Sequence, residues 1–165
     1  MEIERKFLIE DTSALPFRPE EYPSRRIEQG YLCTEPVVRV RRDGDEYYLT
    51  YKGKGLLARE EYNLPLTREA YAHLIAKADG IILSKRRYRI PLTDAMKAGS
   101  PETVPAEVLP LTVELDVFEG RYQGLILAEV EFPTMEQAES FTPPSWFGPD
   151  VTLSGEYQNS RLSRG

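Results

Sequence analysis

Charged residues alternate along the first segment of the chain. Residues 1–10 contain no glycine or proline and are expected to form a β-strand, in which successive side chains point to opposite faces. Glu2, Glu4 and Lys6 therefore share one face. Because the two carboxylates repel each other, a divalent cation between them would stabilise this face, and Lys6 could neutralise an anion held by that cation. A solvated strand face of mixed charge is the alternative interpretation.

The same alternation recurs in later segments of the chain. In five of the eight strands expected below, a pair or triple of charges lies opposite apolar residues, which have to be buried. The charged faces are then expected to lie together. With Glu61 added, they collect seven acidic residues: Glu2, Glu4, Glu61, Glu114, Asp116, Glu129 and Glu131. They also collect seven basic residues: Lys6, Arg39, Arg41, Lys52, Lys85, Arg87 and Arg89.

A mostly β fold would position these faces. The pattern predicts strands over residues 1–10, 25–33, 37–41, 46–52, 57–64, 81–91, 111–118 and 123–132. Helices are expected after Thr67 and Thr134 and, as a short one, over 155–164, and the proline-containing stretches 11–24 and 92–110 are expected to be loops. The predicted class is α+β and mostly β: one domain over residues 1–165, with a closed eight-stranded antiparallel barrel and a few helices packed outside.

A closed barrel of this size holds side chains or one small ligand in its interior. Unpaired charges in a dry interior cost several kcal/mol each, so the lumen is expected to hold water, ions and a ligand. Arginine matches phosphate oxygens, whereas carboxylates without histidine or cysteine suit Mg²⁺ or Mn²⁺. A polyphosphate with a divalent metal would satisfy both sets. An open sheet with one solvated charged face is the alternative.

Composition limits the class of protein. The chain has 165 residues and a net charge of −6, which argues against nucleic acid as a partner even though residues 85–89 are densely basic. It has no run of about 18 apolar residues that could span a membrane. The single cysteine, Cys33, fits a reducing cytoplasm and is expected in the core. His73, the only histidine, is expected on the surface.

An ordered set of motifs resembles the CYTH family, the triphosphate tunnel metalloenzymes. The resemblance covers nearly the whole chain, and its tail, Trp146-x-Gly148-x-Asp150, looks like that of small bacterial members. The other motifs are Glu2-x-Glu4-x-Lys6, Arg39-x-Arg41, Lys52-Gly53, Lys85-x-Arg87-Tyr88, Asp116-Val117-Phe118-x-Gly120 and Gly124-Leu125-x-x-Ala128-Glu129-Val130-Glu131-Phe132. The resemblance implies an eight-stranded tunnel and metal-dependent chemistry on a triphosphate.

The resemblance also implies roles for individual residues. Metal would be held by Glu2, Glu4, Glu129 and Glu131. Phosphate oxygens would be held by Lys6, Arg39, Arg41, Lys52, Lys85, Arg87 and, by its place on the same face, Arg89. Catalytic roles, either at a second metal or in positioning water, would fall to Glu61, Glu114 and Asp116. Tyr31 matches a tyrosine that in small bacterial members is paired with the signature lysine, here Lys6, so Lys6 and Tyr31 are also expected to be catalytic residues.

The chain departs from the family pattern at two places. Asn63 stands where members often carry an acid, and Gln158 lies where a basic residue is common, so Arg161 or Arg164 would have to serve in its place. These departures bear on the substrate and on one metal contact.

The expected function is metal-dependent hydrolysis of a phosphoanhydride bond, with inorganic tripolyphosphate as the first substrate to test and nucleoside triphosphates as others. The alternatives are a class IV adenylyl cyclase, a thiamine triphosphatase and a non-catalytic polyphosphate or nucleotide binder. A homodimer is left open.

Overall fold

The structure is a computed structural model that describes residues 1–99, 105 and 107–165. The strands in this part of the chain are β1 Glu2–Ile9, β2 Ser24–Thr34, β3 Val37–Asp43, β4 Glu46–Lys52, β5 Ala58–Arg59, β6 Glu61–Pro65, β7 Asp79–Pro91, β8 Thr112–Glu119 and β9 Ile126–Glu131. The α-helices are α1 Arg68–Ile75, α2 Leu92–Gly99, α3 Met135–Ser140 and α4 Asn159–Leu162. Short 3-10 helices are η1 Thr12–Ala14, η2 Pro19–Glu21 and η4 Gly120–Tyr122.

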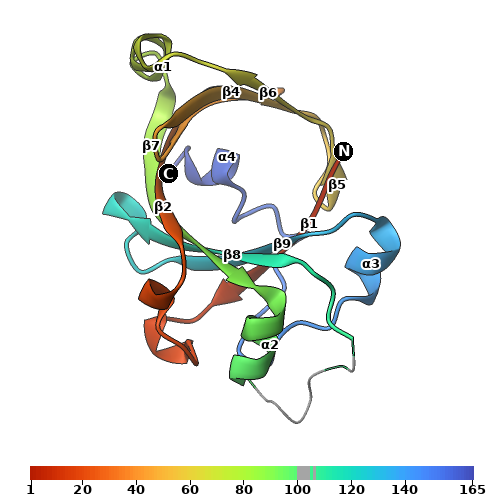
Figure 1. Cartoon of the computed structure of the whole chain (residues 1–165). Helices are drawn as coiled ribbons and strands as arrows, with labels where there is room; N and C mark the ends of the chain where they lie inside the picture. The colour runs from red at the N-terminus through yellow and green to blue at the C-terminus, as the bar shows by residue number, and fades with distance from the viewer. Residues whose placement is uncertain (100–104, 106) are drawn as a thin grey trace.

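The strands form one antiparallel sheet that curls into a nearly closed barrel (Figure 1). The strand order is β5-β1-β9-β8-β7-β2-β3-β4-β6. Only Glu60 separates β5 from β6, so residues 58–65 act as one interrupted strand that pairs with β1 at one end and with β4 at the other. Because β5 and β6 count as one, the barrel has eight strands, which confirms the predicted architecture.

Strand alternation sorts the side chains as expected. Apolar residues of β1, β7, β8 and β9 face outward and pack beneath α2 and α3. This core contains Ile3, Phe7, Ile9, Ile90, Val113, Leu115, Ala128 and Val130. Their burial removes apolar surface from water, which is the main force that holds the sheet closed. Glu4, Lys6, Arg87, Glu114 and Glu129, on the opposite face of the same strands, consequently line the lumen.

The C-terminal residues close one end of the lumen. Leu162 of α4 is buried in a second cluster with Tyr31, Leu83, Phe118 and Leu127. By strand alternation Leu83, Phe118 and Leu127 point the same way as the lumen charges of their own strands. Figure 1 accordingly shows α4 within the outline of the ring, whereas α1 and α3 lie outside it as predicted, and α2 also lies outside.

Two expectations from the sequence are wrong. Residues 92–99, predicted as part of a loop over 92–110, form α2, because Leu92, Ala95 and Met96 recur at helical spacing and are buried against the core; residues 100–104 and 106 of that stretch lie outside the described part. Cys33 is exposed rather than buried. The register of β2 shifts between Tyr31 and Cys33, and such a bulge turns the following side chain to the other face.

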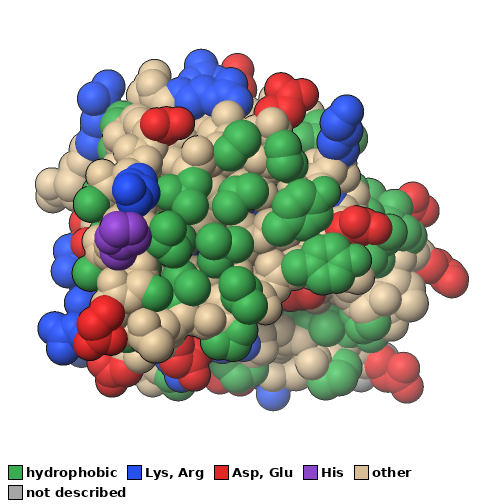
Figure 2. Space-filling view, turned by 90° about the horizontal axis from the view of Figure 1, so that it is seen from above, with side chains coloured by type: hydrophobic (Ala, Val, Ile, Leu, Met, Phe, Trp, Pro, Cys, Tyr) green, Lys and Arg blue, Asp and Glu red, His purple; other side chains and the backbone are tan. Residues whose placement is uncertain are grey.

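The outer surface over α1, β4 and β6 stays partly apolar. Figure 2 looks onto this face, where hydrophobic side chains gather. Tyr62 and Leu64 of β6 are exposed there, and His73 of α1 is exposed as expected. No helix among the described residues is long and apolar enough to cross a membrane.

Candidate active site

A cavity of about 520 Å³, here called the front cavity, occupies the charged part of the lumen. Most of the predicted site residues line it: Glu2, Glu4, Lys6, Tyr31, Arg39, Arg41, Lys52, Glu61, Arg87, Arg89, Glu114, Glu129 and Glu131. It brings together side chains from β1, β3, β4, β6, β7, β8 and β9, which are far apart in the sequence. In total, seven acidic and seven basic side chains line the cavity.

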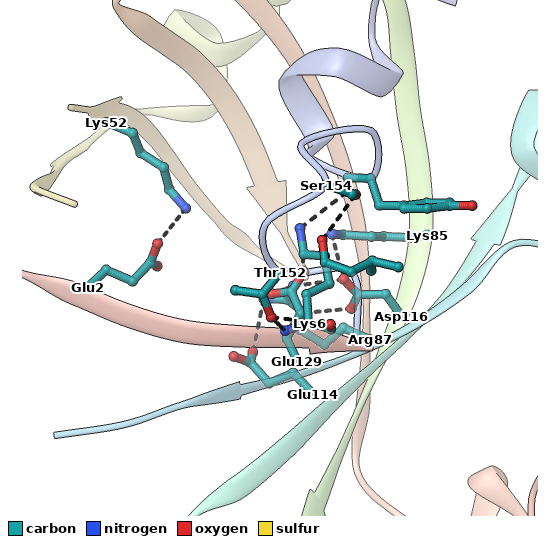
Figure 3. A network of polar contacts seen from close by, with 12 residues as sticks. Glu2, Lys6, Lys52, Lys85, Arg87, Glu114, Asp116, Glu129, Thr152 and Ser154 are labelled. Carbon is teal, nitrogen blue, oxygen red and sulfur yellow. Dashed lines mark hydrogen bonds and ion pairs between the residues drawn. The ribbon is translucent and has the colours of Figure 1, made fainter. Parts of the chain in front are cut away.

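Several of these charges neutralise each other across the strands. Figure 3 shows Lys52 pointing toward Glu2, and the Lys52 Nζ to Glu2 Oε1 distance is 2.8 Å. Lys52 Nζ also lies 3.8 Å from Glu61 Oε2. The Lys6 ammonium lies 3.4 Å from a Glu129 oxygen. The contact between Lys6 and Glu129 outweighs burial, raising the pKa of Lys6 and lowering that of Glu129, so both stay charged. Burial raises the pKa of Glu2 and, with the charge of Arg39, lowers the pKa of Lys52, although these two residues are in contact.

The basic residues of β7 form a second paired group. Arg87 Nη1 donates to a Glu114 oxygen at 2.9 Å, and Arg89 Nη1 lies 3.8 Å from the same carboxylate. Arg87 also lies 3.5 Å from Glu129. Glu114 therefore faces two guanidinium groups, which leaves it a poor ligand for a cation in this arrangement.

Lys85 and Asp116 lie beneath the cavity and do not line it. Both are fully buried, and Lys85 Nζ donates to Asp116 Oδ2 at 2.7 Å. Arg87 donates to both oxygens of the same carboxylate, at 2.7 Å and 2.8 Å. Although burial favours the protonated acid, Arg87 and Lys85 hold the pKa of Asp116 below its usual range. The network fixes the orientation of Arg87, so the structure gives Lys85 and Asp116 a supporting position.

Two acids remain without a cationic partner. Glu4 on β1 and Glu131 on β9 are register partners in the sheet, and neither forms an ion pair among the described residues. Burial, with the nearby charge of Glu129, raises the pKa of Glu4 to about 8. Burial, with Glu2 and Glu114, also raises the pKa of Glu131. These two oxygen donors are therefore available to a cation.

Two bases remain without an acidic partner on the opposite side of the ring. Arg39 and Arg41 of β3 form no ion pair within the described chain, and Arg41 Nε donates to Gln29 Oε1 at 2.7 Å. The buried Nε of Arg39 has no hydrogen-bond partner among the described residues. Burial, together with the charges of Arg39 and Arg87, lowers the pKa of Arg41. An anion between Arg39 and Arg41 would remove this repulsion.

Residues 149–157 position Lys6 from outside β1. The Lys6 backbone N–H donates to Thr152 Oγ1 at 3.0 Å, and the Val151 N–H donates to the Lys6 carbonyl at 2.9 Å. The Lys6 ammonium donates to the Tyr157 carbonyl at 3.2 Å. Tyr31, which the resemblance pairs with Lys6, is an electrostatic partner of Arg39.

Several residues of the front cavity do not belong to the charge pattern of the sequence. They are Met1, Asp43, Tyr48, Arg59, Asn63 and Asn159. Alternation could have identified two of them. Tyr48 shares a strand face with Lys52, and Arg59 shares one with Glu61. Asn159 had no such signal, since it reaches the cavity from α4. Arg161 and Arg164, considered as substitutes for a base at Gln158, line a different cavity.

A sequence match places the chain in a known family. A model of the CYTH domain matches residues 1–143, so the chain belongs to the CYTH domain family.

Relatives with assigned names match over nearly their whole length. The inorganic triphosphatase of Nitrosomonas europaea is 34% identical over 165 residues, which cover 98% of this chain and 96% of the relative. The inorganic triphosphatase of Acetivibrio thermocellus is 30% identical over 172 residues, which cover 98% and 92%.

Solved structures agree on the fold. The crystal structure of the inorganic triphosphatase NE1496 aligns with a TM-score of 0.67 at 32% identity and covers 100% of this chain and 95% of that one. A putative adenylate cyclase from Bacillus halodurans aligns with a TM-score of 0.55 at 16% identity over 84% of each chain, and at this identity the match shows the fold alone.

We predict that Glu4 destabilises the metal-free protein as pH rises. Its folded pKa of about 8 lies above the ordinary value of 4.5, so between these values the folded chain holds a proton that the unfolded chain releases. Stability is therefore lost as pH increases through this window. At pH 8 in chelator, Glu4→Gln is expected to raise the free energy of unfolding by about 1–3 kcal/mol in urea titrations. Glu139→Gln, on the exposed face of α3, is the control. Parallel stability curves for Glu4→Gln and wild type between pH 5 and 8 would contradict the prediction.

Proposed function

We propose that the protein is a divalent-metal-dependent hydrolase that cleaves a phosphoanhydride bond of inorganic tripolyphosphate. One observation carries the proposal: the acids Glu4 and Glu131 and the bases Arg39 and Arg41 remain unpaired on opposite sides of one cavity. A cation alone would satisfy only the first pair, and an anion alone only the second. A metal-bound triphosphate satisfies both.

The oxygen donors fit a hard divalent cation, for which we propose Mg²⁺ or Mn²⁺. Of the four acids expected to hold it, Glu2 and Glu129 are engaged by lysines, which leaves Glu4 and Glu131. Within the described residues, no group of three or more acidic, histidine or cysteine side chains is placed to hold a metal. We therefore expect the protein to supply few ligands and the phosphate oxygens to supply others, as is usual for Mg²⁺.

The basic residues would stabilise the charge of the transferring phosphoryl group. Arg39 and Arg41 offer unpaired guanidinium groups, while Arg87 is held in place by Asp116. Such preorganised donors account for much of the catalysis of phosphoryl transfer, which needs positioning and charge stabilisation more than covalent chemistry. When bound, the divalent cation would offset phosphate charge and lower the pKa of the attacking water.

Glu61 is our candidate for positioning water or a second cation, and Glu114, which faces two guanidinium groups, is our candidate for positioning water. Glu61 lies 3.8 Å from the Lys52 ammonium, and Glu114 lies 2.9 Å from Arg87. Both line the cavity in partly buried positions. Each could receive or orient a water hydrogen once phosphate oxygens compete for its basic partner.

The names of the relatives support the choice of substrate. Both curated relatives are named inorganic triphosphatase, and together they match 98% of this chain at 30–34% identity. The front cavity is lined almost entirely by polar and charged side chains, which suits an inorganic anion.

Phosphate release from tripolyphosphate and from ATP, measured side by side, tests the proposal. We expect release from tripolyphosphate that depends on Mg²⁺ or Mn²⁺, is abolished by chelator and exceeds release from ATP. Cyclic AMP with pyrophosphate as products would establish a cyclase instead. Binding of tripolyphosphate without turnover at any pH or with either metal would establish a binding protein.

We predict that Arg39→Ala lowers kcat/KM for tripolyphosphate by about 100-fold or more, because it removes a preorganised donor from the phosphate site. Arg42→Ala is the matched control, since Arg42 lies on the same strand but is exposed on the outer face, where it donates to the Gly44 carbonyl. Equal activities of the two variants in steady-state assays would argue against a phosphate role for Arg39.

A further inference from the structure

A second cavity of about 530 Å³, here called the rear cavity, lies at the other end of the barrel strands. β3 runs from Val37, which lines the rear cavity, to Asp43, which lines the front cavity. The turn between β2 and β3, the loop that follows β4 and part of the C-terminal segment form its walls. Lys52 and Arg59 line both cavities, so the two are neighbours.

The rear cavity has a different charge balance from the front cavity. Five basic side chains and a single acidic one, Glu35, line it. The basic residues are Lys52, Lys54, Arg59, Arg161 and Arg164. The whole chain carries a net charge of −6, so this local excess of positive charge runs against the overall composition. A site with bases and almost no acids attracts an anion but offers no ligand set for a metal.

Several of these basic groups are free to bind. Arg164 Nη2 donates to Thr34 Oγ1 at 2.8 Å, which ties the C-terminal segment to β2 and leaves its other N–H groups available. Lys54, Arg59 and Arg161 form no ion pair within the described part of the chain. Guanidinium groups match phosphate oxygens in a bidentate way.

We propose that the rear cavity is a second, non-catalytic binding site for a small phosphate anion such as pyrophosphate, which it takes without a divalent cation. The choice of phosphate among anions rests on the proposed function, because hydrolysis of a triphosphate releases orthophosphate and pyrophosphate. Residues 155–164, which supply both C-terminal arginines, lie beyond the region matched by the family model. An anion in the rear cavity would lie beside Lys52, whose ammonium contacts Glu2 in the front cavity.

Calorimetric titration of the metal-free protein with pyrophosphate, in chelator and at fixed ionic strength, tests this site without requiring turnover. The double variant Arg161→Gln/Arg164→Gln is expected to bind pyrophosphate about tenfold or more weakly than wild type, since it loses two charged donors. Arg42→Gln, the exposed control on β3, should bind as wild type does. Arg39→Gln, in the front cavity, should retain the chelator-resistant binding.

Unchanged affinity in the double variant would overturn the inference, as would loss of binding in Arg39→Gln alone. The single variant Arg161→Gln, which keeps the Arg164 to Thr34 hydrogen bond, is included in case the double variant fails to fold, and its affinity should fall about threefold. If the protein binds pyrophosphate in chelator but hydrolyses no triphosphate, the rear site stands and the proposed function is wrong. Hydrolysis of tripolyphosphate without chelator-resistant binding of pyrophosphate would support the proposed function and overturn the rear site.

Discussion

Closure of the sheet removes a set of charged side chains from bulk water, and the rest of the structure depends on how those charges are compensated. Desolvation of each ion is costly unless a partner or ligand is present. Asp116 has such partners, since Lys85 lies 2.7 Å away and Arg87 donates to both of its oxygens. Among the charges that stay unpaired, those on β1 and β9 and on β3 define what a ligand has to supply. The candidate active site is thus the uncompensated part of a lumen that otherwise neutralises itself.

The C-terminal segment makes the two ends of the lumen different. Leu162 packs with Leu83, Phe118 and Leu127 below the charged residues, so an apolar cluster fills part of the end of the barrel that holds the rear cavity. The same segment holds Lys6 through Tyr157. The family model ends at residue 143, yet the closed end and the position of Lys6 both depend on residues beyond it. The front and rear cavities consequently differ in charge as well as in location.

Alternation along strands predicted much of the fold and the site from the sequence. It placed Glu4, Glu131 and Arg39 on one inner surface because a strand side chain has only two directions to point. It could not tell which of these charges form ion pairs and which stay unpaired, since pairing depends on which strands become neighbours. Alternation therefore gave no sign that Lys85, whose phosphate role the family resemblance implied, is hydrogen-bonded to Asp116. The helix over residues 92–99 was missed because nearby prolines and Gly99 outweighed a short apolar repeat.

Binding of Mn²⁺ to the wild-type protein, followed by electron paramagnetic resonance with and without a non-hydrolysable tripolyphosphate analogue, tests the central claim most directly. With only Glu4 and Glu131 free, we predict weak metal binding alone and binding tighter by about tenfold or more when the analogue supplies oxygens and occupies Arg39 and Arg41. If the metal affinity is the same with and without the analogue, the central claim is contradicted. That claim is that the cation neutralises the acids on one side of the cavity while the triphosphate neutralises the arginines on the other.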